Sequence, residues 1–262
     1  MMPAISTPKL KTSWPRRFDA QLTFLSYPVL SCPVLSCPVL SYPALSTKRN
    51  LNMITLYDCT TTPNPRRARI LLAEKGVAHE TVQVDLRNSE QLSDAYQKIN
   101  PQCTVPALRT EEGAILTDNA AITAYLEARY PAPPLLGTTP DEKAQIASWN
   151  WRVEFEGLMA VAEALRNSAP AMANRALPGQ MNYAQIPELA QRGLARLQQF
   201  FVMLNERLAD RNFIATERFS VADITAVVAV DFARIVKIKP GEQHPHLQRW
   251  RAAMAQRPSM AL

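Results

Sequence analysis

The chain has 262 residues, of which 47% are hydrophobic, 20% charged and 7% aromatic, a composition typical of globular proteins. Seven glycines and four cysteines exclude a collagen-like chain and a disulfide-rich scaffold, and no apolar run of about 18 residues indicates a transmembrane helix. The net charge of +6 is uneven, because residues 1–52 carry six basic residues and one acidic residue, whereas residues 53–262 carry 23 and 22. We therefore expect neither a nucleic acid nor a membrane as partner.

Residues 1–52 differ in pattern from the rest of the chain. They contain seven of the 21 prolines and no glycine, and four pentapeptides follow one another over residues 26–45: SYPVL, SCPVL, SCPVL and SYPAL. A proline at every fifth position interrupts helices and sheets, which favours a polyproline II-like or disordered extension. Three interpretations remain open: an unstructured extension or a region outside the natural product, a targeting peptide, and a proline-rich ligand for a partner.

From Met53 onward the pattern predicts a small α/β half. Apolar or alternating runs predict strands over 53–57 and 79–86, and a hairpin over 105–117 with Gly113 in its turn. Helical spacing over 68–76 ends at Gly76, and further helices are expected over 89–100 and 118–131. This order predicts a thioredoxin-like arrangement, with a mixed sheet and helices on both faces.

The second half of the chain is expected to be all-α. A proline-rich stretch over 131–140 predicts a linker. The predicted organisation is a thioredoxin-like α/β domain over 53–132, a linker over 133–140 and a helical domain over 141–262. Helical patterns run over 141–167, 187–210, 221–238 and 246–256. Ser220 and Asp223 fit a capping box at the start of an almost wholly apolar helix, which predicts that this helix is central and buried.

The first candidate site is the strand-to-helix junction at Thr62, Pro63 and Asn64. A helix N-terminus carries partial positive charge and unpaired amides, and a hydroxyl there can donate to a thiolate. Stabilising a thiolate by about 2.7 kcal/mol lowers the thiol pKa by roughly two units, which makes it nucleophilic near neutral pH. The alternative is that Thr62 and Asn64 only cap the helix.

Two further segments are candidates for binding. Pro106 at a strand start indicates a possible cis bond, which in a thioredoxin-like fold exposes the backbone of Val105 to an extended peptide ligand. Asp118 and Asn119 begin a predicted helix, where side chains and free amides can bind a carboxylate and an amine. An ordinary trans proline and plain helix capping are the alternatives.

Together these motifs resemble the cytosolic glutathione S-transferases along the whole of residues 53–262. The resemblance rests on ITLYDCTTTPNPRRARILLAEKG, NPQCTVPAL, DNAAITAYLEARYP and FSVADITAVVAVDFA. The TPN triplet is similar to that of bacterial Nu-class and related members, in which Thr and Asn face the thiol. The resemblance therefore implies that Thr62 and Asn64 are catalytic residues.

The resemblance also implies a complete glutathione site. Val105 and Pro106 match the cis-proline motif, and Asp118 and Asn119 replace the usual Glu-Ser pair that holds the γ-glutamyl group. Cys103 occupies a position that is usually Gly, and Thr104 one where Lys or Gln often binds the glycine carboxylate. Gln102 or Lys98 could supply this contact instead. Arg152 and Phe155 lie on the helix that faces the electrophile in this family, although such residues are more often core.

The leading hypothesis is a glutathione transferase that attacks apolar electrophiles, with glutathione as co-substrate, no metal and a cytoplasmic location. The resemblance alone implies a homodimeric assembly. The alternatives are glutathione-dependent disulfide reduction and a non-catalytic module that binds a protein partner. His244 and His246 are too few for a metal site, and an exposed helix start is expected there.

Overall fold

The computed structural model describes residues 53–262, so the expectations for residues 1–52 lie outside the described part of the chain. Four strands form one sheet in the order β2-β1-β3-β4. β1 and β2 are parallel, whereas β3 is antiparallel to both β1 and β4. The bounds are β1 (Ile54–Asp58), β2 (His79–Gln83), β3 (Ala107–Arg109) and β4 (Ile115–Leu116). These strands confirm the predicted mixed sheet and its terminal hairpin.

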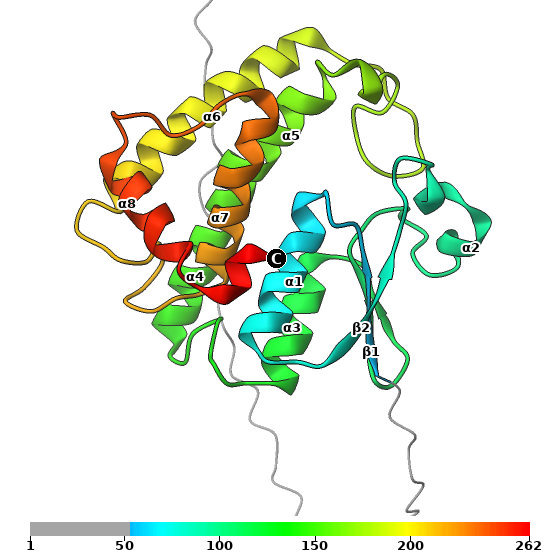
Figure 1. The fold of residues 1–262 in the computed structure, drawn as a ribbon, viewed down its shortest axis with the longest axis horizontal. Helices are drawn as coiled ribbons and strands as arrows, with labels where there is room; N and C mark the ends of the chain where they lie inside the picture. Colours follow the sequence, from blue (N-terminus) through cyan, green and yellow to red (C-terminus); the bar gives the residue numbers. More distant parts are fainter. Residues whose placement is uncertain (1–52) are drawn as a thin grey trace, which may run out of the picture. The chain divides into compact units, whose positions relative to one another are not determined.

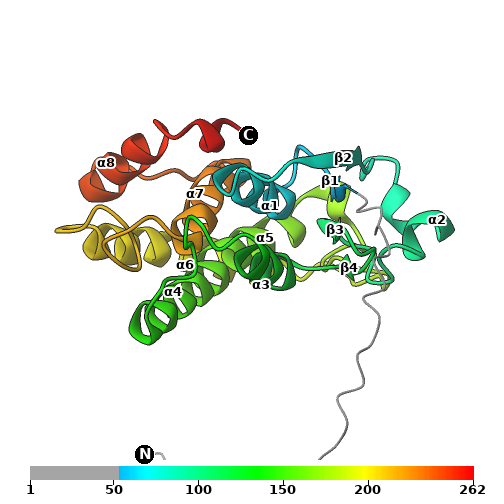
Figure 2. The ribbon, with the colours of Figure 1, turned by 90° about the horizontal axis from the view of Figure 1, so that it is seen from below.

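Helices cover both faces of this sheet (Figure 2). α1 (Pro63–Glu74) and α3 (Asn119–Arg129) lie between the sheet and the C-terminal helices, and α2 (Asp94–Gln97) lies on the other side. The backbone leaves α1 at Gly76 with a φ of +62°, as the sequence predicted. The single helix expected over 89–100 is wrong. The chain forms a 3₁₀ turn, η1 (Glu90–Leu92), and then α2, because the Ser93 hydroxyl accepts from the Tyr96 amide and starts a new helix.

The second half is helical, as predicted, with one isolated bridge between Arg175 and Tyr183 among the described residues. α4 (Pro140–Arg152), the π-helical η2 (Val153–Leu158) and α5 (Met159–Arg166) follow one another without a break (Figure 1). The remaining helices are α6 (Pro187–Arg207), α7 (Val221–Phe232) and α8 (Pro245–Met254), with 3₁₀ turns η3 (Pro170–Met172), η4 (Ala233–Val236) and η5 (Pro258–Ala261). No helix within residues 53–262 has the length and hydropathy needed to cross a bilayer.

α7 lies at the centre of the helical half and packs against both α1 and α4. All of its residues from Val221 to Val230 are buried. The Asp223 side chain is fully buried at its start, where Oδ2 accepts from the Ser220 amide and hydroxyl, both at 3.1 Å. Its Oδ1 accepts from the Ile214 amide at 2.9 Å and the Trp250 indole at 3.3 Å. The central, capped helix expected over 221–238 is therefore confirmed, although its last turn is 3₁₀.

The segment between the two halves is fixed by a buried charge. Lys75 follows the last turn of α1 and donates to Glu127 and to the carbonyls of Tyr130 and Pro133, at 2.8 and 2.7 Å. Glu127 also accepts from the amides of Leu135 and Leu136. One hydrophobic cluster spans both sides of this segment and includes Leu56, Leu71 and Val227. Domain boundaries at 132 and 140 stay a prediction.

Candidate functional site

The site is built around the first turn of α1. Thr62 is the extended N-cap residue, and both its amide and its hydroxyl donate to the Cys59 carbonyl, at 3.1 and 2.9 Å. Its side chain accepts no hydrogen bond from the helix, so capping by the Thr62 hydroxyl is wrong. The hydroxyl is half-buried beside a cavity, and rotation about its Cβ–Oγ1 bond re-aims the proton.

Within residues 53–262, the Asn64 amide of the same turn makes no hydrogen bond. Of the amides that lack a partner at a helix start, the Thr62 amide is satisfied, and Pro63 and Pro65 have none. The Asn64 amide remains. The Asn64 carbonyl accepts from the Asn119 side chain at 3.1 Å, which brings the starts of α1 and α3 together.

Asp118 acts as the N-cap of α3, since its Oδ1 accepts from the Ala121 amide at 2.8 Å. The capping alternative is thus confirmed for Asp118, but the side chain is also exposed beside the Asn64–Asn119 contact. The functional interpretation of Asp118 and Asn119 stays a prediction.

The Val105–Pro106 peptide bond is cis. Because Ala107 pairs with Tyr57, this segment lies at the end of β1, where the loop to Thr62 begins. Within residues 53–262 neither backbone group of Val105 makes a hydrogen bond. The Thr104 carbonyl, by contrast, accepts from the buried Asn100 side chain and the Tyr96 hydroxyl, both at 2.8 Å.

The turn before Val105 also has a defined shape. Cys103 has a φ of +56°, a left-handed conformation that favours glycine, which accounts physically for the Gly usual at this position in the family. The Gln102 amide donates to the Asn100 side chain, while the Gln102 side chain is exposed.

A cavity of about 210 Å³ lies beside Thr62. Its polar rim consists of the loop Thr60–Thr62, Arg66 and Asp231. Its apolar wall comes from the last turns of α7 and from η4, with Val228, Phe232 and Ile235. Sequence reasoning missed this wall. The available signal was Asp231, the one acidic residue inside the apolar run VVAVDFA.

Asp231 stays ionised at this rim. Burial alone would raise its pKa, but hydrogen bonds and charges from Arg251 and Arg66 outweigh that effect and lower it. Arg66 and Arg251 both donate to Oδ2 at 2.8 Å, and Arg251 also donates to Oδ1 at 2.9 Å. The rim therefore carries a fixed, already paired carboxylate rather than a free base.

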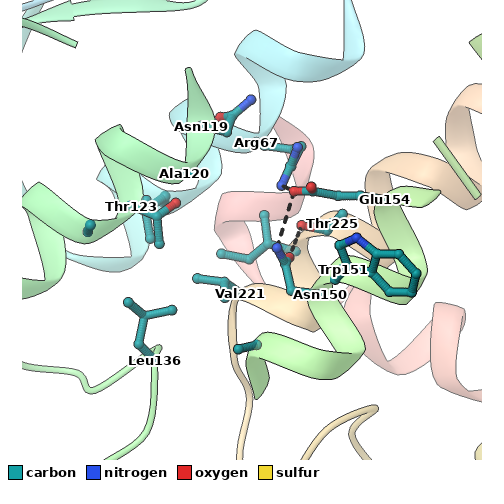
Figure 3. A pocket seen from close by; sticks show the side chains of 14 residues that line it. Arg67, Asn119, Ala120, Thr123, Leu136, Asn150, Trp151, Glu154, Val221 and Thr225 are labelled. Atoms are coloured by element: carbon teal, nitrogen blue, oxygen red, sulfur yellow. Dashed lines mark hydrogen bonds and ion pairs between the residues drawn. The ribbon is translucent and has the colours of Figure 1, made fainter. Parts of the chain in front are cut away.

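A larger cavity of about 310 Å³ lies between α1, α3, α4 and α7 (Figure 3). On its polar side Arg67 and Asn150 both donate to Glu154, and Thr225 donates to Asn150 at 2.7 Å. Burial lowers the pKa of Arg67, and the charge of Glu154 opposes this shift. No residue of the loop 60–65 lines this cavity, although Asn119 does, whereas residues 60–63 line the smaller one.

Other predicted positions lie elsewhere. Arg152 stacks on Trp149 at 4.7 Å and Phe155 stacks on Trp151 at 5.2 Å, and neither lines the cavity beside Thr62. His244 is buried at the start of α8, so the expectation of an exposed helix start is wrong for it. Among residues 53–262, no group of three or more His, Cys, Asp or Glu is placed to hold a metal ion.

Comparison with known proteins decides the family. The model of the glutathione S-transferase N-terminal domain matches residues 61–129, and that of the C-terminal domain matches residues 169–258. Glutathione S-transferase 2 of Saccharomyces cerevisiae is 32% identical over 207 residues, which cover 78% of this chain and 87% of that protein. The chain belongs to the glutathione S-transferase superfamily.

Solved structures of the superfamily share the fold. A glutathione S-transferase domain-containing protein of Marinobacter aquaeolei VT8 is 35% identical with a TM-score of 0.72, over 79% of this chain and 99% of that one. Gtt2 of Saccharomyces cerevisiae is 31% identical with a TM-score of 0.73, over 79% and 98%. The thioredoxin-like half followed by the all-α half is thus the transferase architecture.

Proposed function

We propose that the protein is a glutathione transferase that holds the glutathione sulfur as a thiolate and directs it onto a hydrophobic electrophile. The observation that carries this proposal is that Thr62, whose hydroxyl can donate to a thiolate, and the apolar wall of α7 line one cavity, with the Asn64 amide in the same first turn of α1. Superfamily membership and the names of the relatives support it.

The thiolate accepts hydrogen bonds from the protein in place of those that it would accept from water. The Thr62 hydroxyl turns from the Cys59 carbonyl to the sulfur, and the Asn64 amide donates from the positive end of α1. Each charge-assisted hydrogen bond contributes on the order of 1.5–3 kcal/mol, so the thiol pKa falls by one or two units. The thiol proton leaves to solvent.

The electrophile lies on the apolar wall formed by Val228, Phe232 and Ile235. The sulfur forms a bond to the electrophilic carbon, and the displaced group leaves with the bonding pair. The cavity holds the two reactants at contact distance, which supplies part of the rate enhancement through proximity. Because Arg66 is paired with Asp231, the rim adds no free acid or base to this step.

The ends of glutathione fit the two remaining segments. The γ-glutamyl group meets Asp118 and Asn119 at the start of α3, and the cysteinyl backbone pairs with the free groups of Val105. The glycine carboxylate lies toward Lys98 and Gln102, both of which are exposed. We further propose a cytoplasmic detoxification role and a homodimeric assembly.

Calorimetric titration of glutathione into the full chain tests the proposal. Saturable binding in the micromolar to low-millimolar range, with conjugation of an aryl halide, is the expected result. Binding without conjugation, but with reduction of a mixed disulfide, replaces the transferase by a disulfide reductase. Absence of binding at several millimolar contradicts the proposal and favours a non-catalytic interaction module.

A further inference from the structure

The long connection between α5 and α6 folds back on itself in the segment 174–183, which we call the clamp loop. Its ends are joined by hydrogen bonds from the Ala176 amide to the Tyr183 carbonyl and from the Tyr183 amide to the Asn174 carbonyl, at 3.1 and 3.0 Å. The Arg175 side chain stabilises the loop by donating to the Gly179 carbonyl at 2.7 Å and to the Asn182 side chain at 3.1 Å. The loop is therefore a folded unit.

The base of the clamp loop is anchored to the helical half. The Gln185 side chain donates to the carbonyls of Arg166 and Ala169, both at 2.8 Å. The Ile186 amide donates to the buried side chain of Asn167 at 3.0 Å. These contacts hold the loop at the C-terminal end of α5.

The tip of the clamp loop crosses to the thioredoxin-like half, next to α2 (Figure 1). The Gln180 side chain donates to the Pro101 carbonyl at 2.8 Å and to the Gln97 side chain at 3.3 Å. Gly179, with a φ of +112°, lies so close that an added Cβ would be 3.6 Å from the Gln102 carbonyl. The tip thus contacts the turn that leads to the Val105–Pro106 bond.

Apolar burial does not hold this tip in place. The large apolar side chains of the loop remain about half exposed or more: Leu177 50%, Met181 66% and Tyr183 47%. The contact with the other half is therefore polar, and Gln180 supplies its two side-chain hydrogen bonds.

Gln180 acts on a turn that carries two free polar side chains. In the sequence, Lys98 follows the acceptor Gln97 and Gln102 follows the acceptor Pro101. Both Lys98 and Gln102 are exposed. Neither side chain makes a hydrogen bond or ion pair within residues 53–262. A cation and an amide with free donors, one before and one after Pro101 in the sequence, are groups that bind a carboxylate.

We propose that Gln180 is a positioning residue that holds the 97–102 turn in the conformation in which Lys98 and Gln102 bind the glycine carboxylate of glutathione. The helical half then sets the affinity for one end of a ligand that the other half binds. This inference rests on the proposed function, because it assumes that glutathione is the ligand.

The test compares two thiols that differ only at this end. Glutathione and γ-glutamylcysteine share the thiol and the γ-glutamyl group, but γ-glutamylcysteine lacks the glycine. Calorimetry on the full chain measures the dissociation constant of each thiol for the unmodified protein, Gln180→Ala and Gln191→Ala. Gln191 is a matched control, since it is an exposed glutamine on α6 whose side chain makes no hydrogen bond to residues 53–262.

Loss of the Gln180 amide is expected to weaken glutathione binding on the order of fivefold, the value for one neutral hydrogen bond. The affinity for γ-glutamylcysteine and the thermal midpoint stay unchanged, and Gln191→Ala changes neither ligand. Equal weakening of both thiols, or of neither, overturns the positioning role while leaving the proposed function in place. If the unmodified chain binds neither thiol, both the proposed function and this inference are wrong.

Discussion

At the residue scale, the proposed mechanism assigns stabilisation of the thiolate to the hydroxyl of Thr62. Thr62→Ala removes the donor and is expected to raise the pKa of the bound glutathione thiol by one to two units, with a matching loss of turnover at neutral pH. Ultraviolet absorbance of the thiolate, followed against pH at saturating glutathione, measures this pKa. Thr62→Ser keeps the hydroxyl and is expected to stay close to the unmodified protein. An unchanged thiol pKa in Thr62→Ala would remove Thr62 from the catalytic assignment.

Asp223 makes stability depend on pH in a definable direction. Burial raises its pKa from 3.8 to about 6, against the opposing hydrogen bonds from Ile214, Ser220 and Trp250. Protonation therefore favours the folded state, and the contribution of this group to stability falls as pH rises from about 4 to about 6 and is constant above that. The shift corresponds to no more than about 3 kcal/mol.

The comparison with Asp223→Asn isolates this effect. The variant lacks the titration and turns an amide toward donors, so it is expected to be less stable by about 2 kcal/mol at neutral pH. Denaturant unfolding at several pH values gives the difference between the two proteins. The difference in the free energy of unfolding between the unmodified protein and the variant should decrease as pH rises from about 4 to about 6. A pH-independent difference would show that the Asp223 carboxyl titrates at its ordinary value.

At the scale of elements, the sequence predicts a helix correctly where neighbouring residues alone determine its start and its burial. The apolar run after Ser220 predicts a buried helix, since it can pack on every side. The Ser220–Asp223 pair marks the start of this helix. The stretch 89–100 has helical composition throughout, and the break at Ser93 depends on one hydroxyl accepting from Tyr96. Such competition between a side chain and the helix is not encoded in periodicity.

The candidate site divides in the same way. Thr62, Asn64 and Pro106 belong to short motifs that can be recognised in the sequence, and the cis bond before Pro106 is confirmed. The wall at Val228 and Phe232 is contributed from more than 150 residues along the chain, and its position depends on the packing of α7 against α1. Arg152 and Phe155 do not line the cavity beside Thr62, and their role in binding the electrophile stays a prediction.

The connection between the halves depends on Lys75 at the end of α1. Its ammonium is buried and satisfies Glu127 and two carbonyls. Lys75→Met keeps the length of the side chain but leaves the Glu127 carboxylate without its counter-charge. We expect a loss of about 2–4 kcal/mol in the free energy of unfolding, measured by denaturant titration. Lys143→Met, at an exposed lysine on α4, is the control. A loss below about 0.5 kcal/mol would contradict the assignment of Lys75 as a structural anchor.

At the scale of the whole molecule, one face of the helical half carries an exposed apolar row. Trp151, Phe155 and Met159 are spaced by four residues along α4, η2 and α5, and are 60%, 46% and 52% exposed. The rings of Trp151 and Phe155 are stacked, and the Arg196 guanidinium lies 4.6 Å from the centre of the Phe155 ring. Exposed aromatic and methionine side chains gathered on one face are typical of protein–protein interfaces.

We expect a second copy of the chain to cover this row, in line with the proposed homodimer. Phe155→Glu places a charge in the middle of the row and should convert the dimer to a monomer at micromolar concentration, because desolvating an unpaired carboxylate opposes association. Sedimentation equilibrium measures the assembly state, and Phe155→Leu is expected to remain dimeric. Glutathione binding by the Phe155→Glu monomer should persist, since all the proposed contacts come from one chain. A monomeric unmodified protein would contradict the proposed homodimer.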